Sequence, residues 1–226
     1  MWSGSLAAPN GSLYGIPAFA RRVAKFNPID KSITEIGPDF GNEQGKWHQG
    51  AINGSGIIYC VPYGFDSHRG ILKIDTNTDT VTELDVNLLP ERGEDMWMSC
   101  AAALDGYIYF MPANARRIMK IDPNNNDAMS SIGDDLGRGQ YKCVDTVVGI
   151  DGCVYGIPDW SNCILKYDPI NETTLFIREE ANKGFYCIVV PIFLVLSEIR
   201  MRNEGRPIDD DNYPDDDDDD DGGWSR

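Results

Sequence analysis

The sequence predicts an all-β protein built from four tandem antiparallel sheets of four strands each. Three observations predict this fold class: a unit of 45–50 residues recurs four times, turn-forming residues separate short β-rich runs within each unit, and no run inside the units keeps a helical apolar period. The chain has 226 residues, of which 42% are hydrophobic, so it can bury a core.

A hairpin motif recurs in every unit. Four glycines, spaced 45, 50 and 46 residues apart, are each followed by a Tyr three residues later and a Pro six residues later. They are Gly11, Gly56, Gly106 and Gly152. In three copies Asn or Asp precedes the Gly, and such a pair favours a tight hairpin turn because Gly tolerates positive φ. The motif therefore predicts two strands, a and b, joined by a short turn.

The first run of each unit begins nine residues before its Gly, and the positions where these runs open are Trp2, Trp47, Trp97 and Cys143. Two further runs complete the unit. The third ends in Lys, an apolar or aromatic residue and Asp or Asn, followed by turn-forming residues, which predicts strand c and the turn after it. These segments are Lys25–Asn27, Lys73–Asp75, Lys120–Asp122 and Lys166–Asp168. A β-branched run such as Thr80–Leu84 closes the unit as strand d. Because the Lys recurs in every unit, we expect it to be structural rather than catalytic.

Strand b predicts how the sheets pack. In the first unit its two faces carry Tyr14 with Ile16 and Leu13 with Gly15, and the other units are apolar on both faces in the same way. A strand that is apolar on both faces is covered on both sides. Four-stranded sheets stacked face to face at a period of 40–50 residues are typical of a β-propeller, so we predict this architecture.

The repeats resemble the blades of kelch-like and streptogramin-lyase-like propellers. The resemblance lies in phrases such as Ile108-Tyr109 followed by Ile118–Pro123, and it extends over residues 1 to about 187 at the level of single blades. It implies a propeller fold. Enzymes of the lyase-like group use histidines that bind a metal and act as a base. This chain has only His48 and His68, neither of which recurs in a second unit, so the resemblance assigns no catalytic residue.

The predicted domain organisation is a propeller over residues 1–187 followed by an acidic, disordered tail over 188–226. The blades cover about 2–45, 46–95, 96–141 and 142–182, and a fifth begins at 183–187. The tail carries seven consecutive Asp, Asp215–Asp221, and a run of like charges without apolar partners is solvated. We expect the four blades to belong to a larger, incomplete propeller. The alternative is a closed ring of four.

The predicted binding face is formed by the b–c and d–a loops, because these vary in length while the a–b and c–d turns are short and uniform. The candidate ligand- or partner-binding residues on it are Arg21, Arg22, His68, Arg69, Arg116, Arg117, Asp159, Trp160, Trp47 and Trp97. The alternative for the arginines is pairing with a nearby acid such as Asp39, Asp95 or Asp135. The alternative for the tryptophans is packing between blades.

The leading functional hypothesis is a non-enzymatic binding or scaffold module that recognises a protein or a small ligand on this loop face. The alternative is a propeller lyase or hydrolase with a metal in the central channel, although strand a offers few metal ligands. We expect no catalytic residue, no metal and no cofactor. The six Cys lack a C-x-x-C spacing and predict buried free thiols in a reducing compartment.

The partner classes follow from charge and hydropathy. The net charge is −16, and a basic surface for nucleic acid is not expected. The most apolar stretch, Phe185–Leu196, is 12 residues long, whereas a spanning helix needs about 20, so we expect no membrane partner. The start of the chain does not read as a signal peptide, and we therefore expect a cytoplasmic location.

Overall fold

The computed structural model describes residues 1–63, 69–91, 93, 95–158 and 163–178. All of them belong to one compact unit, Met1–Phe185. The predicted fifth strand at 183–187 and the predicted tail lie outside the described residues. Among the described residues, no helix is long and apolar enough to span a membrane.

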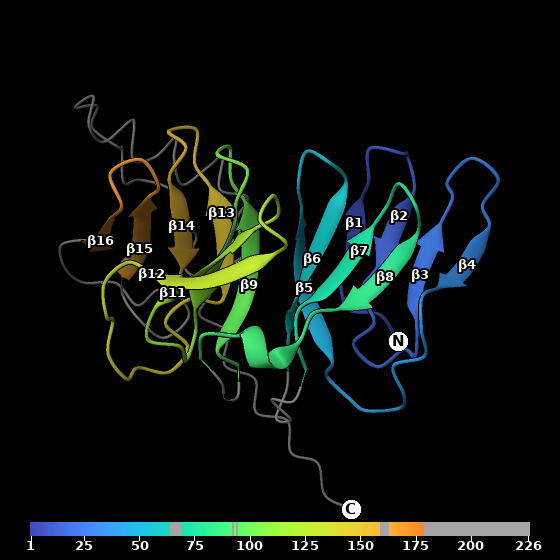
Figure 1. Ribbon diagram of the computed structural model, residues 1–226, viewed down its shortest axis with the longest axis horizontal. Coiled ribbons are helices and arrows are strands. Elements are labelled where there is room, and N and C mark those ends of the chain that lie inside the picture. The colour runs from blue at the N-terminus through green and yellow to red at the C-terminus, as the bar shows by residue number, and fades with distance from the viewer. Residues whose placement is uncertain (64–68, 92, 94, 159–162, 179–226) are drawn as a thin grey trace, which may run out of the picture. The chain divides into compact units, whose positions relative to one another are not determined.

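The described chain forms four antiparallel sheets, each with its four strands paired in chain order (Figure 1). The first sheet has β1 (Ser5–Ala7), β2 (Leu13–Gly15), β3 (Val23–Phe26) and β4 (Ile33–Ile36). The second has β5 (Trp47–Ile52), β6 (Ile57–Pro62), β7 (Leu72–Asp75) and β8 (Thr80–Glu83). The third has β9 (Trp97–Ala102), β10 (Ile108–Pro112), β11 (Ile118–Asp122) and β12 (Ala128–Ile132). The fourth has β13 (Asp145–Val148), β14 (Val154–Ile157), β15 (Cys163–Asp168) and β16 (Thr173–Arg178). In the described ranges, one 3₁₀ turn, η1 (Val86–Leu88), lies between the second and third sheets. The predicted all-β fold and its four repeats are confirmed.

The a–b turns are built by one local device. In three of them a side-chain oxygen accepts a hydrogen bond from the backbone N–H two residues later, at 2.9–3.1 Å. The capping residues are Asn10, Asp105 and Asp151. The Gly that follows each of them has φ between 76 and 90°, a left-handed conformation that disfavours other residues. The uniform turns therefore follow from local sequence alone.

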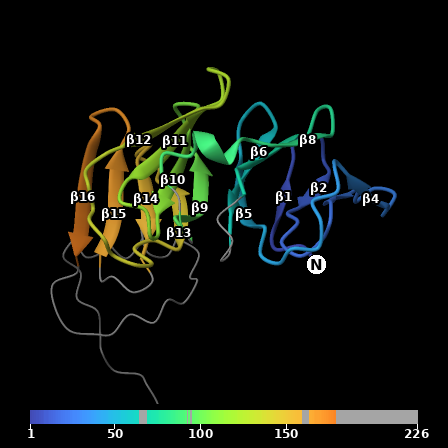
Figure 2. The same cartoon turned by 60° about the horizontal axis from the view of Figure 1, so that its bottom comes forward.

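The core lies between successive sheets. The first strands β1, β5, β9 and β13 are neighbours in that order, and the first and fourth sheets stand at the two ends of the row (Figures 1 and 2). Each joint between two sheets has its own apolar cluster. In the first joint, Tyr14 and Ile16 of the first sheet pack with Ile58 and Leu72 of the second. Both faces of strand b are thus buried in the inner sheets, as its apolar pattern predicts.

A hydrogen-bond network reinforces the first joint. The hydroxyl of Tyr14 donates to Oδ1 of Asp79 at 2.7 Å, and Nζ of Lys25 binds the same carboxylate at 2.6 Å. Tyr14 and Lys25 belong to the first sheet, whereas Asp79 lies in the c–d turn of the second. Burial alone would raise the pKa of Asp79, but the bonds from Lys25 and Tyr14 hold it below its usual value. The second sheet therefore supplies the acid for the first.

The second joint repeats this arrangement. Tyr59 donates to Oδ1 of Asp127 at 2.5 Å, and Lys73 binds Oδ2 at 2.6 Å. Asp127 belongs to the c–d turn of the third sheet and has φ of 56°, as does Asp79. Burial, followed by the bond to Asp127, raises the pKa of Tyr59 far above its ordinary value, so the hydroxyl keeps its proton. The following sheet again supplies the acid.

The third and fourth sheets use a different acid. Tyr109 donates to Asp105 at 2.7 Å and Tyr155 donates to Asp151 at 2.8 Å, and both acids lie in the a–b turn of the same sheet. Lys166 also binds Asp151, at 2.9 Å. The hydrogen-bond acceptor for strand b therefore comes from within the sheet in this half of the chain.

Candidate binding face at the loop ends of the sheets

The b–c and d–a loops meet where strand a begins and strand b ends. Arg21 and Asp39 pair there in the first sheet, with Nε to Oδ1 at 2.9 Å and a second contact between Nη2 and Oδ2. The hydrogen bonding from Arg21 is the main reason that the pKa of Asp39 is lowered to about 2. The same pair recurs in the third sheet as Arg116 and Asp135, with Nε to Oδ1 at 2.9 Å. Each Arg thus ties its own b–c loop to the d–a loop of the same sheet.

The neighbouring arginines bind backbone instead. Arg22 donates to the carbonyl of Gly37, and Arg117 donates to the carbonyl of Gly133. Both glycines have positive φ at the end of strand d, at 79 and 71°. All four arginines therefore have partners within the loops that carry them.

Arg69 occupies the corresponding loop of the second sheet. It binds Glu83 at 3.0 Å, contacts Glu43, and lies over the Trp47 ring at 5.3 Å from its centroid. Its partners are thus two glutamates, where the sequence had suggested an acid such as Asp95. The role of the arginines in binding a ligand stays a prediction.

The predicted tryptophans lie beneath this face. Trp47 and Trp97 are buried, and their Nε1 atoms donate to the carbonyls of Gly70 at 2.9 Å and Arg117 at 3.3 Å. Phe40, from the d–a loop of the first sheet, packs edge-on against Trp47 at 4.8 Å. Both rings thus hold sheets and loops together. The remaining candidates, His68, Asp159 and Trp160, lie outside the described residues.

His48 is the notable group that the candidate residues did not include. It follows Trp47 on β5, where the register with β6 shifts between Trp47 and Gly50, and such a bulge re-aims side chains. Its ring lies 4.9 Å from that of Tyr63, the first residue of the b–c loop. Its Nδ1 is buried without a hydrogen-bond partner. Burial lowers the pKa of His48, against the opposing charge of Asp95, so the imidazole is neutral near pH 7.

The sequence contains one signal for His48. At the position after the first residue of strand a, the four units hold different residues, namely Ser3, His48, Met98 and Val144. Strand b, by contrast, keeps its Tyr and the Pro that follows it in all four units. Because this position of strand a varies between units, the repeated fold does not require a particular residue there, and His48 is free to serve another purpose.

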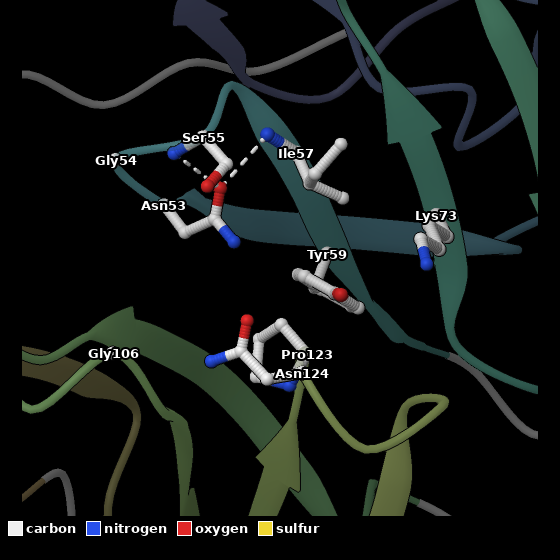
Figure 3. A pocket seen from close by; sticks show the side chains of 9 residues that line it. All are labelled: Asn53, Gly54, Ser55, Ile57, Tyr59, Lys73, Gly106, Pro123 and Asn124. Atoms are coloured by element: carbon white, nitrogen blue, oxygen red, sulfur yellow. Dashed lines mark hydrogen bonds between the residues drawn. The ribbon is translucent and has the colours of Figure 1, made fainter.

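A pocket lies on the opposite side, at the a–b and c–d turns between the second and third sheets (Figure 3). Its volume is about 250 Å³. Asn53, Ser55, Tyr59 and Lys73 line it from the second sheet, and Asn124 lines it from the third. Tyr59 and Lys73 are already bound to Asp127. The pocket is a groove over the second joint, and its strongest polar groups are engaged.

The described residues show little that suits metal binding or thiol chemistry. No group of three or more His, Cys, Asp or Glu side chains is placed there to hold a metal ion. Four of the described cysteines, Cys60, Cys100, Cys143 and Cys153, are buried thiols, and burial raises the pKa of Cys143 to about 12.

No family model matches this sequence, and no curated protein matches it. Solved structures do match. Virginiamycin B lyase from Staphylococcus aureus superposes with a TM-score of 0.64 at 17% identity, covering 80% of this chain and 56% of the lyase. A catalytically inactive His-to-Ala variant of that lyase with quinupristin matches with the same score at 16% identity, covering 80% of this chain and 56% of that one. An auxiliary nutrient binding protein from Bacteroides ovatus matches at 0.57 and 14% identity, covering 82% of this chain and 43% of that one.

These neighbours are β-propeller proteins, and this chain has a β-propeller fold. At such identities the likeness concerns the fold alone. The chain spans little more than half the length of the lyase that it matches. The narrower resemblance to kelch-like blades stays a prediction.

Proposed function

We propose that this chain is a non-enzymatic binding module that takes a small ligand on the b–c and d–a loop face, beside His48 and Tyr63. One observation carries the proposal: the buried Nδ1 of His48 has no hydrogen-bond partner. A buried polar atom without a partner costs about 1–3 kcal/mol, and this cost is tolerated most readily at functional sites.

The chemistry of the two rings indicates the kind of ligand. Both side chains are half-buried, so part of each remains open to solvent. A neutral imidazole offers one donor and one acceptor, and the ring of Tyr63 offers an apolar surface. A cyclic or aromatic ligand with a hydroxyl or amide group fits this combination. A rearrangement on binding that gives Nδ1 a partner would add to its affinity.

The surrounding loops favour a rigid site. The Arg21–Asp39 and Arg116–Asp135 pairs tie loops together in the first and third sheets, and Arg69 of the second sheet binds Glu43 in the preceding d–a loop. Function is commonly carried by variable loops on a rigid scaffold, and here the variable positions lie on this side. The acidic tail and protein partners remain outside this proposal.

The test is a thermal-shift and calorimetric screen of sugars, nucleosides and cyclic peptides, quinupristin included, with the wild-type chain and His48→Ala. A ligand of this site should bind the wild type and lose at least tenfold in affinity with His48→Ala. Met98→Ala, at the equivalent position of the third sheet, is the matched control and should bind as the wild type does. Equal binding by all three proteins would refute the site.

A lyase is the second candidate, because structural neighbours include a lyase with a catalytically inactive His-to-Ala variant. Mass spectrometry of each bound compound after incubation separates the two functions. Recovery of intact compound supports a binding module, whereas a changed mass that requires His48 would establish an enzyme.

A further inference from the structure

Among the described residues, two sheet faces at the ends of the row have no neighbouring sheet. In every internal joint, one sheet presents a leading face, towards the next sheet, and the following sheet presents a trailing face. The leading face of the fourth sheet consists of Tyr155, Ile157, Ile164, Lys166 and Leu175. The trailing face of the first sheet consists of Trp2, Leu13, Phe26 and Ile33. Pairing across strands and alternation along them place each set on one side of its sheet, and Trp2 lies against Gly15 on the trailing side.

The leading face of the fourth sheet is exposed where its equivalents are buried. Ile164 is half-buried, whereas the matching Ile71 and Ile118 are fully buried in their joints. Tyr155 is likewise half-buried, although its three counterparts are buried. Leu175 is 58% exposed, at a position where the other sheets carry Thr or Ser. This exposed surface therefore has the apolar composition of the sheet faces that are buried between two sheets.

The trailing face of the first sheet shows the same difference. Leu13, Phe26 and Ile33 form one row across β2, β3 and β4. The corresponding row of the second sheet, Ile58, Ile74 and Val81, is buried in the first joint, whereas Ile33 is 66% exposed. Trp2 is 39% exposed, although Trp47 at the same position is buried. Within the described part of the chain, these four large apolar side chains have no sheet packed on them, whereas their counterparts do.

The charged groups of the two faces are compatible. The turn position that supplies Asp79 and Asp127 to the preceding sheet holds Lys31 in the first sheet, with φ of 60°. A sheet packed before it would therefore need its own acid for its Tyr, and the fourth sheet has one in Asp151. Contact between the faces would place Lys31 near Asp151 and Lys166, so that the carboxylate of Asp151 lies between two lysines while it still accepts from Tyr155.

We propose that two copies of this chain associate head to tail, with the leading face of each fourth sheet packed on the trailing face of the other copy's first sheet. A head-to-tail contact leaves the remaining two faces open unless the ring closes. Two copies of the four described sheets would close a ring of eight blades, which lies within the range of 4–8 found for propellers. This inference is independent of the proposed ligand site.

The first measurement is the mass of the full chain in solution by light scattering and native mass spectrometry at micromolar concentration. The expected species has twice the chain mass of 25.1 kDa. A monomer, or any assembly larger than two, would overturn the proposal.

Two single variants then test the direction of the contact. Ile164→Glu places a charge in the leading face, and Phe26→Glu places one in the trailing face. Each ring contains two joints of the same kind, so either variant alone should be monomeric with unchanged far-ultraviolet circular dichroism. Ile170→Glu, at a c–d turn position that is 88% exposed and on neither face, is the matched control and should remain dimeric.

Mixing the two variants gives the most discriminating result. The Phe26→Glu chain keeps its leading face and the Ile164→Glu chain keeps its trailing face, so one intact joint should form and yield a one-to-one heterodimer. If Phe26→Glu stays dimeric while Ile164→Glu does not, the copies meet through their fourth sheets alone, and the head-to-tail arrangement is refuted. Failure of the mixture to pair would refute it as well.

Discussion

The first two sheets and the last two sheets satisfy the same buried Tyr hydroxyl in different ways. Tyr14 and Tyr59 use an Asp from the turn of the following sheet, whereas Tyr109 and Tyr155 use an Asp from their own a–b turn. The residue before the Gly of the a–b turn changes accordingly. It is Asn10 or Ser55 in the first half and Asp105 or Asp151 in the second.

This difference separates stability within a sheet from attachment between sheets. An acid that the next sheet supplies loses its bonds to Tyr and Lys when the two sheets separate. The bonds to Asp79 and Asp127 therefore contribute to holding the sheets together. An acid in the same sheet contributes only to that sheet. The third sheet offers an example, since its neighbour holds Glu172 at the turn position of Asp79 and Asp127, and Tyr109 binds Asp105 instead.

The largest effect is expected from Asp127→Asn. The substitution keeps a residue that tolerates left-handed backbone, but it leaves Lys73 without its counter-charge and weakens the bond from the buried Tyr59. We expect a loss of about 1–3 kcal/mol in the free energy of unfolding, measured by urea denaturation. Asp105→Asn should cost less, about 0.5–1.5 kcal/mol, because its bond to Tyr109 is a single contact within one sheet.

The matched control is Asp122→Asn. Asp122 caps an exposed turn by accepting from the N–H of Asn124 at 2.9 Å, a bond that Asn also accepts. Its effect should stay within about 0.5 kcal/mol. Equal losses for Asp127→Asn and Asp105→Asn would contradict the distinction between acids supplied by the next sheet and acids of the same sheet, and an equal loss for Asp122→Asn would show that the effect does not depend on binding Tyr.

A smaller effect should follow from converting the second sheet to the arrangement of the fourth. Adding Ser55→Asp to Asp127→Asn places a carboxylate before the Gly of the a–b turn, as Asp151 is placed for Tyr155 and Lys166. We expect the double variant to recover about 1 kcal/mol of the lost stability, since a bond to a charged group is restored. The same urea denaturation measures it, with Ser55→Asp alone as the reference, and no recovery would show that the joint needs its acid from outside.

The smallest expected effect concerns pH. The folded pKa of Asp79 lies below the unfolded value of 3.8, so its contribution is fully present above pH 3.8 and is lost as the pH falls through the folded pKa. Wild-type stability should therefore fall below about pH 4, and Asp79→Asn should show a shallower fall. Thermal unfolding between pH 6 and pH 2 measures both slopes, and parallel curves would exclude Asp79 as a contributor.

Local patterns determined most of the fold. The Gly, Tyr and Pro spacing predicted the a–b hairpins, the Lys-containing runs predicted strand c, and apolar residues on both faces of strand b predicted stacked sheets. These features could be read directly because turn conformation and strand alternation depend on residues close together in the chain.

The candidate binding face was predicted less fully. The loop positions of Arg21 and Arg116 followed from the repeat, and their pairing with Asp39 and Asp135 had been considered as the alternative. The sequence did not predict the partners of Arg69 or the environment of His48. Glu43 lies 26 residues from Arg69 in the chain, and Tyr63 lies 15 residues from His48, so only the folding of loops against the inner strand brings these groups together.

The sequence by itself determined the number, order and turn chemistry of the described sheets, because each sheet is assembled from neighbouring segments. Only the tertiary structure decided which sheet supplies the acid for each Tyr, which imidazole nitrogen is left without a partner, and which two faces of the described sheets have no other described sheet against them. Those outcomes depend on contacts between separate sheets and on what packing excludes from water, and neither is set by any one segment.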